Sequence, residues 1–198
     1  MAHAMKRLFL GLLIIFCLAR GEVFADTPME QVQQTIQQVM AVVNNPAKES
    51  ELELREKLRG TLMPRFDWPE MAKQALGKHW TTVPNRQSEF VSVFADFIGN
   101  SYIGKIGSYK DEKIVFIHES VDKDIAQVDT KIVSSKGEPT AVNYRLHHVR
   151  GEWKIYDVVV EDISVVANYR SQFNRILATG SFDDLLKRLK EKESKQQN

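Results

Sequence analysis

Cysteine is almost absent from this chain of 198 residues, in which Cys17 is the only one. A lone thiol cannot close an intramolecular disulfide, and it cannot supply a sulfur-ligated metal site. The segment that contains Cys17 is itself expected to be removed on export, so the exported chain would also lack a thiolate nucleophile. Its stability must therefore come from a hydrophobic core and not from covalent cross-links.

Long hydrophobic runs are scarce as well. The apolar run at residues 8–18 has eleven residues, well short of the roughly 20 that a membrane-spanning helix needs. Lys6 and Arg7 precede this run, and a Val-Phe-Ala tripeptide ends at Ala25. This pattern is typical of a secretory signal peptide, and we expect cleavage before Asp26. A retained membrane anchor is the less favoured alternative.

The chain has no excess of charge of either sign. Its 27 Lys and Arg residues oppose 26 Asp and Glu residues, which leaves a formal net charge of +1. Proteins that bind nucleic acid commonly carry a basic patch or a basic excess, so this balance disfavours a nucleic-acid partner. The length after cleavage suits one domain. We predict a single domain over residues 26–190 and a charged, flexible tail at 191–198.

Motifs for nucleophilic, nucleotide and metal chemistry are missing. No serine lies in a G-x-S-x-G turn, and no glycine-rich phosphate loop follows an expected strand. The four histidines after the signal show neither HxxxH nor HExxH spacing, and the adjacent His147 and His148 would point to opposite faces of a strand. We therefore predict no metal and no cofactor.

One acidic cluster allows an enzymatic interpretation. Asp157, Glu161 and Asp162 lie near the end of an expected strand, where a carboxylate beside an apolar pocket could act as a general base. The alternative is a strand-end turn followed by a helix cap, because Asp162 lies two residues before Ser164 and a helical pattern begins just beyond. We favour the structural interpretation and predict no enzymatic activity.

Hydrophobic periodicity predicts helices at both ends of the chain and strands between them. Helical patterns begin after Thr27, from Ser50 in a highly charged run that suggests a surface helix, and after Asp67, which is placed to cap a short helix. A longer helical face with large side chains runs from Phe90 to Ile106. Four strand-like runs are expected at about 113–118, 126–134, 140–150 and 152–160, followed by helices at about 165–178 and from 182.

This order of helices, strands and helices is typical of an α+β domain in which helices cover one face of a sheet. We predict a curved antiparallel sheet of about four strands packed with N- and C-terminal helices, similar to the cone of NTF2 and cystatin proteins. Such a cone either fills its interior with side chains or encloses an apolar cavity. The residue pattern leaves both possibilities open.

Three segments resemble one family in their order and spacing. They are FDWPEMAKQALGKHW at 66–80, WKIYDVV at 153–159 and ISVVANYRSQF at 163–173, which are similar to the toluene-tolerance (MlaC-type) family of periplasmic phospholipid-binding proteins. The resemblance covers roughly residues 62–189 and includes no catalytic motif. The chain departs from the family at Asp162, in the turn before the last of these segments, where the family usually has glycine.

The resemblance implies an apolar cavity that holds the acyl chains of a phospholipid and leaves the head group near its mouth. A cavity for two chains would lie near the upper end of the usual range, roughly 1,000 Å³. The expected cavity wall consists of bulky apolar residues on the long helix, the strands and the following helix: Phe94, Phe97, Ile98, Tyr102, Ile106, Val128, Ile132, Val142, Tyr144, Leu146, Val158, Val160, Ile163, Val166, Tyr169 and Phe173. The candidates for head-group or partner contacts are Lys105, Arg145, Arg150 and Arg170.

The resemblance also implies a role and partners. It implies a periplasmic carrier that shuttles lipid between the outer and inner membranes and maintains outer-membrane lipid asymmetry, with a link to solvent tolerance. The implied partners are the lipid-binding subunit of an inner-membrane ABC transporter and an outer-membrane lipoprotein complex. Three alternatives stay open: an NTF2-like periplasmic enzyme acting on a small apolar substrate, a protein that binds hopanoids or other hydrophobic compounds, and a structural adaptor with a filled core.

Overall fold

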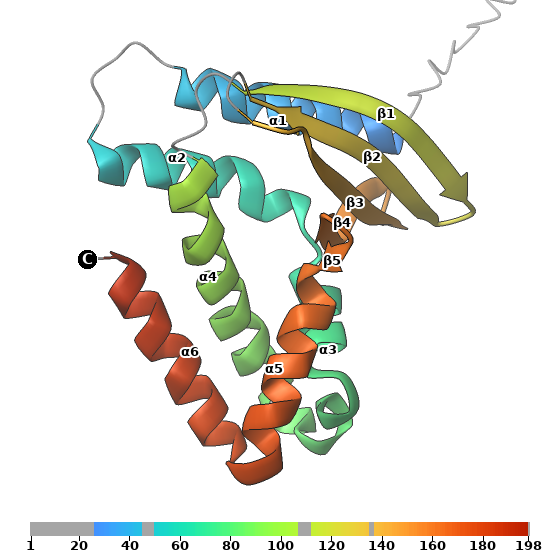
Figure 1. Ribbon diagram of the computed structural model, residues 1–198. Helices are drawn as coiled ribbons and strands as arrows, with labels where there is room; N and C mark the ends of the chain where they lie inside the picture. The colour runs from blue at the N-terminus through green and yellow to red at the C-terminus, as the bar shows by residue number, and fades with distance from the viewer. Residues whose placement is uncertain (1–25, 45–49, 107–111, 135–136, 198) are drawn as a thin grey trace, which may run out of the picture.

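The computed structural model describes residues 26–44, 50–106, 112–134 and 137–197, so the expected signal peptide lies outside the described residues. Helices precede and follow a run of strands, as the sequence predicts (Figure 1). The helices are α1 (Pro28–Val43), α2 (Glu51–Leu62), α3 (Trp68–Leu76), α4 (Gln87–Ile106), α5 (Val165–Thr179) and α6 (Phe182–Gln197), with short 3₁₀ helices η1 (Met63–Arg65), η2 (Gly77–Thr82) and η3 (Pro84–Arg86). The strands are β1 (Lys113–Asp122), β2 (Ile125–Val133), β3 (Thr140–Val149), β4 (Glu152–Val160) and β5 (Ile163–Ser164).

Capping side chains set where the first helices begin. Thr27 and Ser50 each accept a hydrogen bond from the backbone N–H three residues on, and Glu30 and Glu53 complete the capping boxes of α1 and α2. Asp67 caps α3 in the same way, with its Oδ1 2.9 Å from the backbone nitrogen three residues on. These three helix starts are therefore confirmed where the sequence predicts them.

The five strands form one open antiparallel sheet in chain order, which confirms the predicted α+β class. Val128 of β2 lies opposite Tyr144 of β3, and Tyr144 lies opposite Val158 of β4. Side chains that are opposite in register share a face of the sheet, and α1 packs against this face through Val32. The buried Gln31 of α1 fixes the contact, because its side chain exchanges two hydrogen bonds with the backbone of β4.

The end of the sheet contains a bulge in β4 and a tight turn after that strand. The register shift leaves Tyr156 without a direct partner on β3. After β4, Glu161 and Asp162 adopt φ values of 47° and 63°, a left-handed region that aspartate tolerates better than most non-glycine residues. Asp162 thus adopts a conformation that glycine would also supply. The cap of α5 is Ser164, whose Oγ accepts from a backbone N–H of α5 at 3.0 Å.

Three clusters of buried apolar side chains stabilise the described part of the chain. The first joins α3, α4, α5 and α6 and is rich in aromatic rings, the second joins α1 to the sheet, and the third joins α1, α2 and α4. Leu58 in the third cluster is fully buried, so α2 is not the simple surface helix that its charges suggest. In Figure 1, α2 passes between the upper layer of sheet and α1 and the lower helices.

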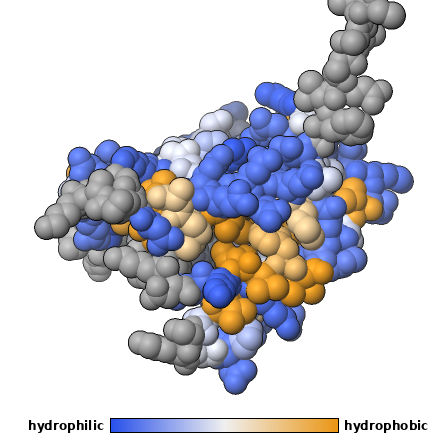
Figure 2. Space-filling model, turned by 90° about the horizontal axis from the view of Figure 1, so that it is seen from above, coloured by the Kyte–Doolittle hydropathy of each residue, from blue (hydrophilic) through white to orange (hydrophobic). Residues whose placement is uncertain are grey.

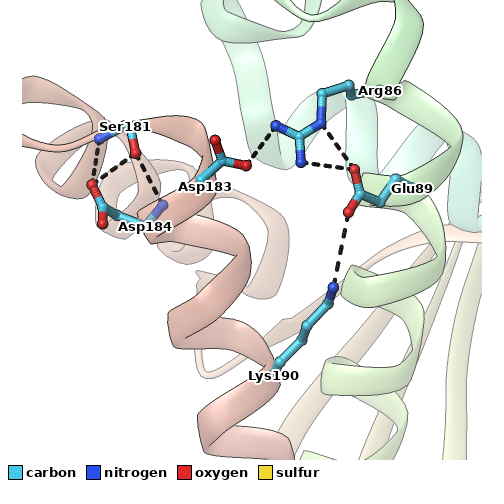
Figure 3. A network of polar contacts seen from close by, with 6 residues as sticks. All are labelled: Arg86, Glu89, Ser181, Asp183, Asp184 and Lys190. Carbon is cyan, nitrogen blue, oxygen red and sulfur yellow. Dashed lines mark hydrogen bonds and ion pairs between the residues drawn. The ribbon is translucent and has the colours of Figure 1, made fainter.

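Ion pairs fix the start of α6 beside the start of α4. Arg86 donates to Asp183 at 2.7 Å and to Glu89 at 2.9 Å, and the Lys190 amine lies 3.8 Å from the Glu89 carboxylate (Figure 3). The two helices run in the same direction (Figure 1), although the five strands and α5 lie between them in the chain. Helix α6 continues to Gln197, so residues 191–197 of the expected charged tail belong to its last turns.

The edge strand β1 carries exposed apolar side chains. Val115, Ile117 and Val121 of β1 and Ile125 of β2 are each 44–54% exposed. Figure 2 shows an apolar patch on the side of the molecule that carries β1. No strand of the described chain pairs with the outer edge of β1, so this edge keeps backbone groups available for pairing.

Candidate functional site

An apolar cavity of about 210 Å³ lies where the three buried clusters approach one another. Its walls come from the end of α2, η1, α3, α4, the start of α5 and the inner face of β3 and β4. The lining residues are Leu62, Met63, Phe66, Trp68, Met71, Ile98, Gly99, Tyr102, Ile103, Ile106, Tyr144, Val158, Val160 and Val165.

Helical and strand periodicity together create two of the walls. On α4 the lining positions are 98, 99, 102, 103 and 106, which is the spacing of one helix face. On the sheet, Tyr144 and Val158 are opposite in register, and Val160 is two residues further along β4, so all three side chains point to the same face. A helix face and a sheet face therefore oppose each other across the cavity.

Phe66 and Trp68 form an aromatic part of the cavity wall, and nearby hydrogen bonds hold it in place. The backbone of Asp67 donates to the Ile155 carbonyl at 2.8 Å, which holds the neighbouring Phe66 against β4. The indole of Trp68 donates to the Met63 carbonyl at 2.9 Å, and the Trp68 and Phe66 rings stack with centroids 5.1 Å apart. With the indole N–H satisfied, both rings can present apolar surface to the cavity.

The cavity lining contains no charged side chain. Burial raises the pKa of Tyr144 to about 12, partly opposed by its hydrogen bond with Thr130, so this phenol stays protonated at neutral pH. The chain described here also contains no group of three His, Cys, Asp or Glu residues that could hold a metal ion. The lining can bury an apolar chain, and it includes no carboxylate, imidazole or amine.

The cavity is smaller than the roughly 1,000 Å³ expected for two acyl chains. At about 210 Å³ it also falls below the usual range for small-molecule sites of about 300–1,000 Å³. Two of its lining residues, Met63 and Met71, are unbranched and adapt easily to a changed neighbour. Binding an acyl chain therefore requires the lining side chains to move apart.

Six of the sixteen residues expected to form the cavity wall line this cavity, namely Ile98, Tyr102, Ile106, Tyr144, Val158 and Val160. The other ten do not line it, because their side chains lie elsewhere in the structure. Phe94, Phe97, Val166, Tyr169 and Phe173 pack in or against the helical cluster, and Val128 and Leu146 pack beneath α1. Val142 is buried outside the lining, Ile132 is half-buried on β2, and Ile163 is 63% exposed.

Sequence reasoning missed the wall made by residues 62–71. A proline that ends α2 and an aspartate that caps α3 lie among these residues. Both signals predict helix boundaries and give no indication of a cavity wall. The residues concerned are Leu62, Met63, Phe66, Trp68 and Met71. Helical spacing from Gly99 would have pointed to Ile103. The sequence does not single out Val165, because the neighbouring Val166 fits the apolar pattern of the helix equally well.

The buried carboxylate considered as a general base has a structural role. Asp157 is 2% exposed and accepts hydrogen bonds from Ser164 Oγ at 2.6 Å, the Val166 backbone at 3.1 Å and Arg145 at 3.2 Å. It precedes Val158, so strand alternation points it away from the cavity. Asp157 thus ties the start of α5 to β4.

The histidines lie in different parts of the described chain. His147 Nε2 lies 2.7 Å from the capping carboxylate of Asp67, and His148 packs on the ring of Trp153. His79 contacts Asn174 at 3.0 Å. Each of these three rings has a neighbouring side chain outside the cavity.

The four basic candidates for head-group contact are not brought together. Lys105 lies near the cavity, with its amine 5.7 Å from the centre of the Tyr102 ring. Arg145 pairs with Asp157 on the opposite side of the sheet, and Arg150 lies in the turn between β3 and β4. Arg170 packs its aliphatic chain against Gly77. Only Lys105 is therefore positioned beside the cavity.

The described helices differ in length and in apolar content. None of them is both long and apolar enough to cross a membrane.

Comparison with known proteins gives a consistent set of relatives. The family model described as "MlaC protein" matches residues 33–191. The chain is 22% identical over 191 residues to the "Intermembrane phospholipid transport system binding protein MlaC" of Haemophilus influenzae, covering 92% of this chain and 89% of the relative. It is 25% identical over 179 residues to the "Toluene tolerance protein ttg2D" of Pseudomonas putida, covering 87% and 82%.

A solved structure shares the fold. The phospholipid-binding protein from Ralstonia solanacearum, determined in complex with a phospholipid, matches with a TM-score of 0.73 at 20% identity. The match covers 84% of this chain and 97% of the other. At this level of identity the similarity establishes the arrangement of sheet and helices.

Proposed function

Since the chain belongs to the MlaC family, we propose that it is a phospholipid-binding carrier whose cavity accepts acyl chains. The observation that carries this proposal is the uncharged lining of the cavity between α4 and the sheet. Each methylene buried there would gain about 0.8 kcal/mol. A membrane offers a similar gain, so lipid could enter and leave such an interior without a large net change in free energy.

The finer role is also a proposal. We infer that the chain is exported to the periplasm by its N-terminal signal and shuttles phospholipid between the two membranes. Its partners there would be the lipid-binding subunit of an inner-membrane ABC transporter and an outer-membrane lipoprotein complex. The result would be maintenance of outer-membrane lipid asymmetry. The intermembrane transport and toluene tolerance named for two relatives support this role.

Binding without catalysis is the chemistry that the site supports best. An enzyme acting on a small apolar substrate would need an acid or base in the cavity. Asp157 is the buried carboxylate that was considered as a general base. It accepts three hydrogen bonds outside the cavity. A structural adaptor would need no cavity at this position.

Native mass spectrometry of the mature protein from a bacterial periplasm tests the proposal. We expect a discrete added mass of one or more phospholipids, identified after solvent extraction. A hopanoid or another hydrophobic compound in the extract would replace phospholipid as the cargo. A folded protein that carries nothing, even after incubation with phospholipid vesicles, would overturn the carrier function.

A further inference from the structure

A second hollow lies directly beside the apolar cavity. It is a cleft of about 620 Å³ between the C-terminal half of α4, the first half of α2, α5 and α6. Arg55, Lys105 and Lys192 contribute to its lining, and no Asp or Glu does. We call it the cationic cleft. A concave surface with three positive charges and no negative charge favours an anionic ligand.

The cationic cleft and the apolar cavity meet at Tyr102, which lines both. Tyr102 is 37% exposed and is the most exposed of the residues that line the cavity. The mouth of the cavity therefore lies at this ring. Lys105, whose amine lies 5.7 Å from the ring centre, stands on the cationic side of the mouth.

Neutral hydrogen-bond donors complete the cleft. The hydroxyl groups of Ser101, Tyr102 and Tyr169 come from facing positions on α4 and α5. Burial, together with the neighbouring Tyr102, raises the pKa of Tyr169, so this phenol remains a donor across the physiological range. Protonated hydroxyls beside cations are groups that bind phosphate oxygens.

One acidic side chain pairs with a cation of the cleft from the rim. Glu51 contacts Arg55 at 2.8 Å within α2, and both side chains are partly exposed. Ion pairs of this kind contribute little to stability. A phosphate in the cleft could therefore share or replace this contact at small cost.

We infer that the cationic cleft binds the phosphate group of the lipid whose acyl chains enter the adjoining cavity. This inference rests on the proposed carrier function. The inference adds to that function by assigning the head group to Lys105 and Lys192, at the cavity mouth formed by Tyr102. The chemistry recognised is a phosphate anion, which a lipid head group or free phosphate could supply, and the experiment separates these sources.

The test compares two soluble lipids with the same short acyl chains, dihexanoylphosphatidylglycerol and dihexanoylglycerol, which differ by the phosphate and its substituent. Binding is followed by intrinsic fluorescence, to which Trp68 in the cavity wall contributes. We expect the wild-type protein to bind the phosphatidyl lipid about tenfold more tightly at low salt, and we expect 1 M salt to reduce this preference because the cleft is open to solvent.

Two variants locate the source of the preference. Lys105→Gln combined with Lys192→Gln should reduce the preference for the phosphatidyl lipid to about twofold. Lys187→Gln removes the same charge from α6 at a side chain that is 75% exposed and outside the cleft, and it should retain the preference.

Each contrary result has a distinct meaning. Equal binding of both lipids by the wild type, or an undiminished preference in the double variant, would overturn the head-group assignment and leave the carrier function standing. Binding of neither lipid would instead count against the carrier function itself. Inorganic phosphate that binds in a Lys105-dependent way without competing with the phosphatidyl lipid would identify a free-phosphate site and also overturn the assignment.

Discussion

The two halves of α4 pack in opposite ways. In the first half, Phe90 and Phe94 are fully buried and meet Phe173 of α5 edge to face, with ring centroids 5.9 and 6.1 Å apart. In the second half, Ile98 and Ile103 are also buried, yet they border the apolar cavity. One continuous helix thus supports a filled core at one end and a hollow at the other.

The size of the facing side chains explains this difference. Aromatic rings from α4 and α5 interdigitate and fill the space between the helices. Past Phe97, the wall that faces α4 is the sheet, which presents Val158 and Val160. Valines and isoleucines on a helix and a sheet that stand apart do not reach each other across the gap. Burial alone therefore does not identify the binding surface.

The largest expected effect comes from emptying the filled half. Phe94→Ala should lower the free energy of unfolding by about 3–5 kcal/mol, because the removed ring leaves a cavity. Urea denaturation would measure the loss, and native mass spectrometry should still find lipid on the folded fraction. Ile106→Ala, at the half-buried end of the hollow half, is the matched control and should cost less. Similar losses for both variants would remove the distinction between the halves.

Alkaline pH should affect the hollow half next most strongly. Burial raises the pKa of Tyr144 to about 12 from 10, so the folded state holds this proton more tightly than the unfolded state. The resulting stabilisation, up to about 3 kcal/mol, is present below pH 10 and is lost as the pH rises towards 12. Tyr144→Phe should lack this component. Thermal denaturation across this range, with tyrosinate absorbance, provides the measurement, and Tyr144 ionising near pH 10 would contradict it.

Asp157→Asn probes the frame around the hollow. We expect a loss of about 2 kcal/mol in the free energy of unfolding, because a buried carboxylate with charge-assisted hydrogen bonds is replaced by a neutral amide. Lipid binding should persist, since the side chain points away from the cavity. Ser164→Ala removes one of the same hydrogen bonds and also the cap of α5, so it should cost about as much. A folded Asp157→Asn protein without lipid would favour a functional role for the carboxylate.

The smallest effect on stability should come from filling the hollow. Ile98→Trp places an indole in existing space and should cost about 1 kcal/mol, the low end for overpacking, while displacing lipid in native mass spectra. Val93→Trp, on the filled half of α4, should cost about 3 kcal/mol or more. If Ile98→Trp retains its full complement of lipid, acyl chains bind elsewhere.

Local chemistry explains why much of the fold was predictable. The caps at Thr27, Ser50 and Asp67 act on backbone groups three residues away, and strand alternation is visible in β4 as regular burial of every second residue. Such signals lie within a few residues of what they determine. The bulge at Tyr156 left no comparable signal, because it depends on the pairing of two strands.

The candidate site was predictable only in part. Phe94, Phe97 and Phe173 have the size and spacing expected of a cavity wall, but they contact one another and fill their own space. Met63 and Trp68 line the cavity, although their sequence neighbours mark a helix end and a helix cap. The volume of a side chain follows from the sequence. The space opposite that side chain depends on which other residues pack there, and this does not follow from the sequence.

The amino-acid sequence by itself determined the family, the α+β class and the order and boundaries of most helices and strands, because periodicity and capping are short-range effects. Only the tertiary structure decided where the three buried clusters leave a gap, which face of α4 borders it and that Lys105 stands at its mouth. Those features depend on side chains far apart in the chain meeting, or failing to meet, across the space between a helix and a sheet.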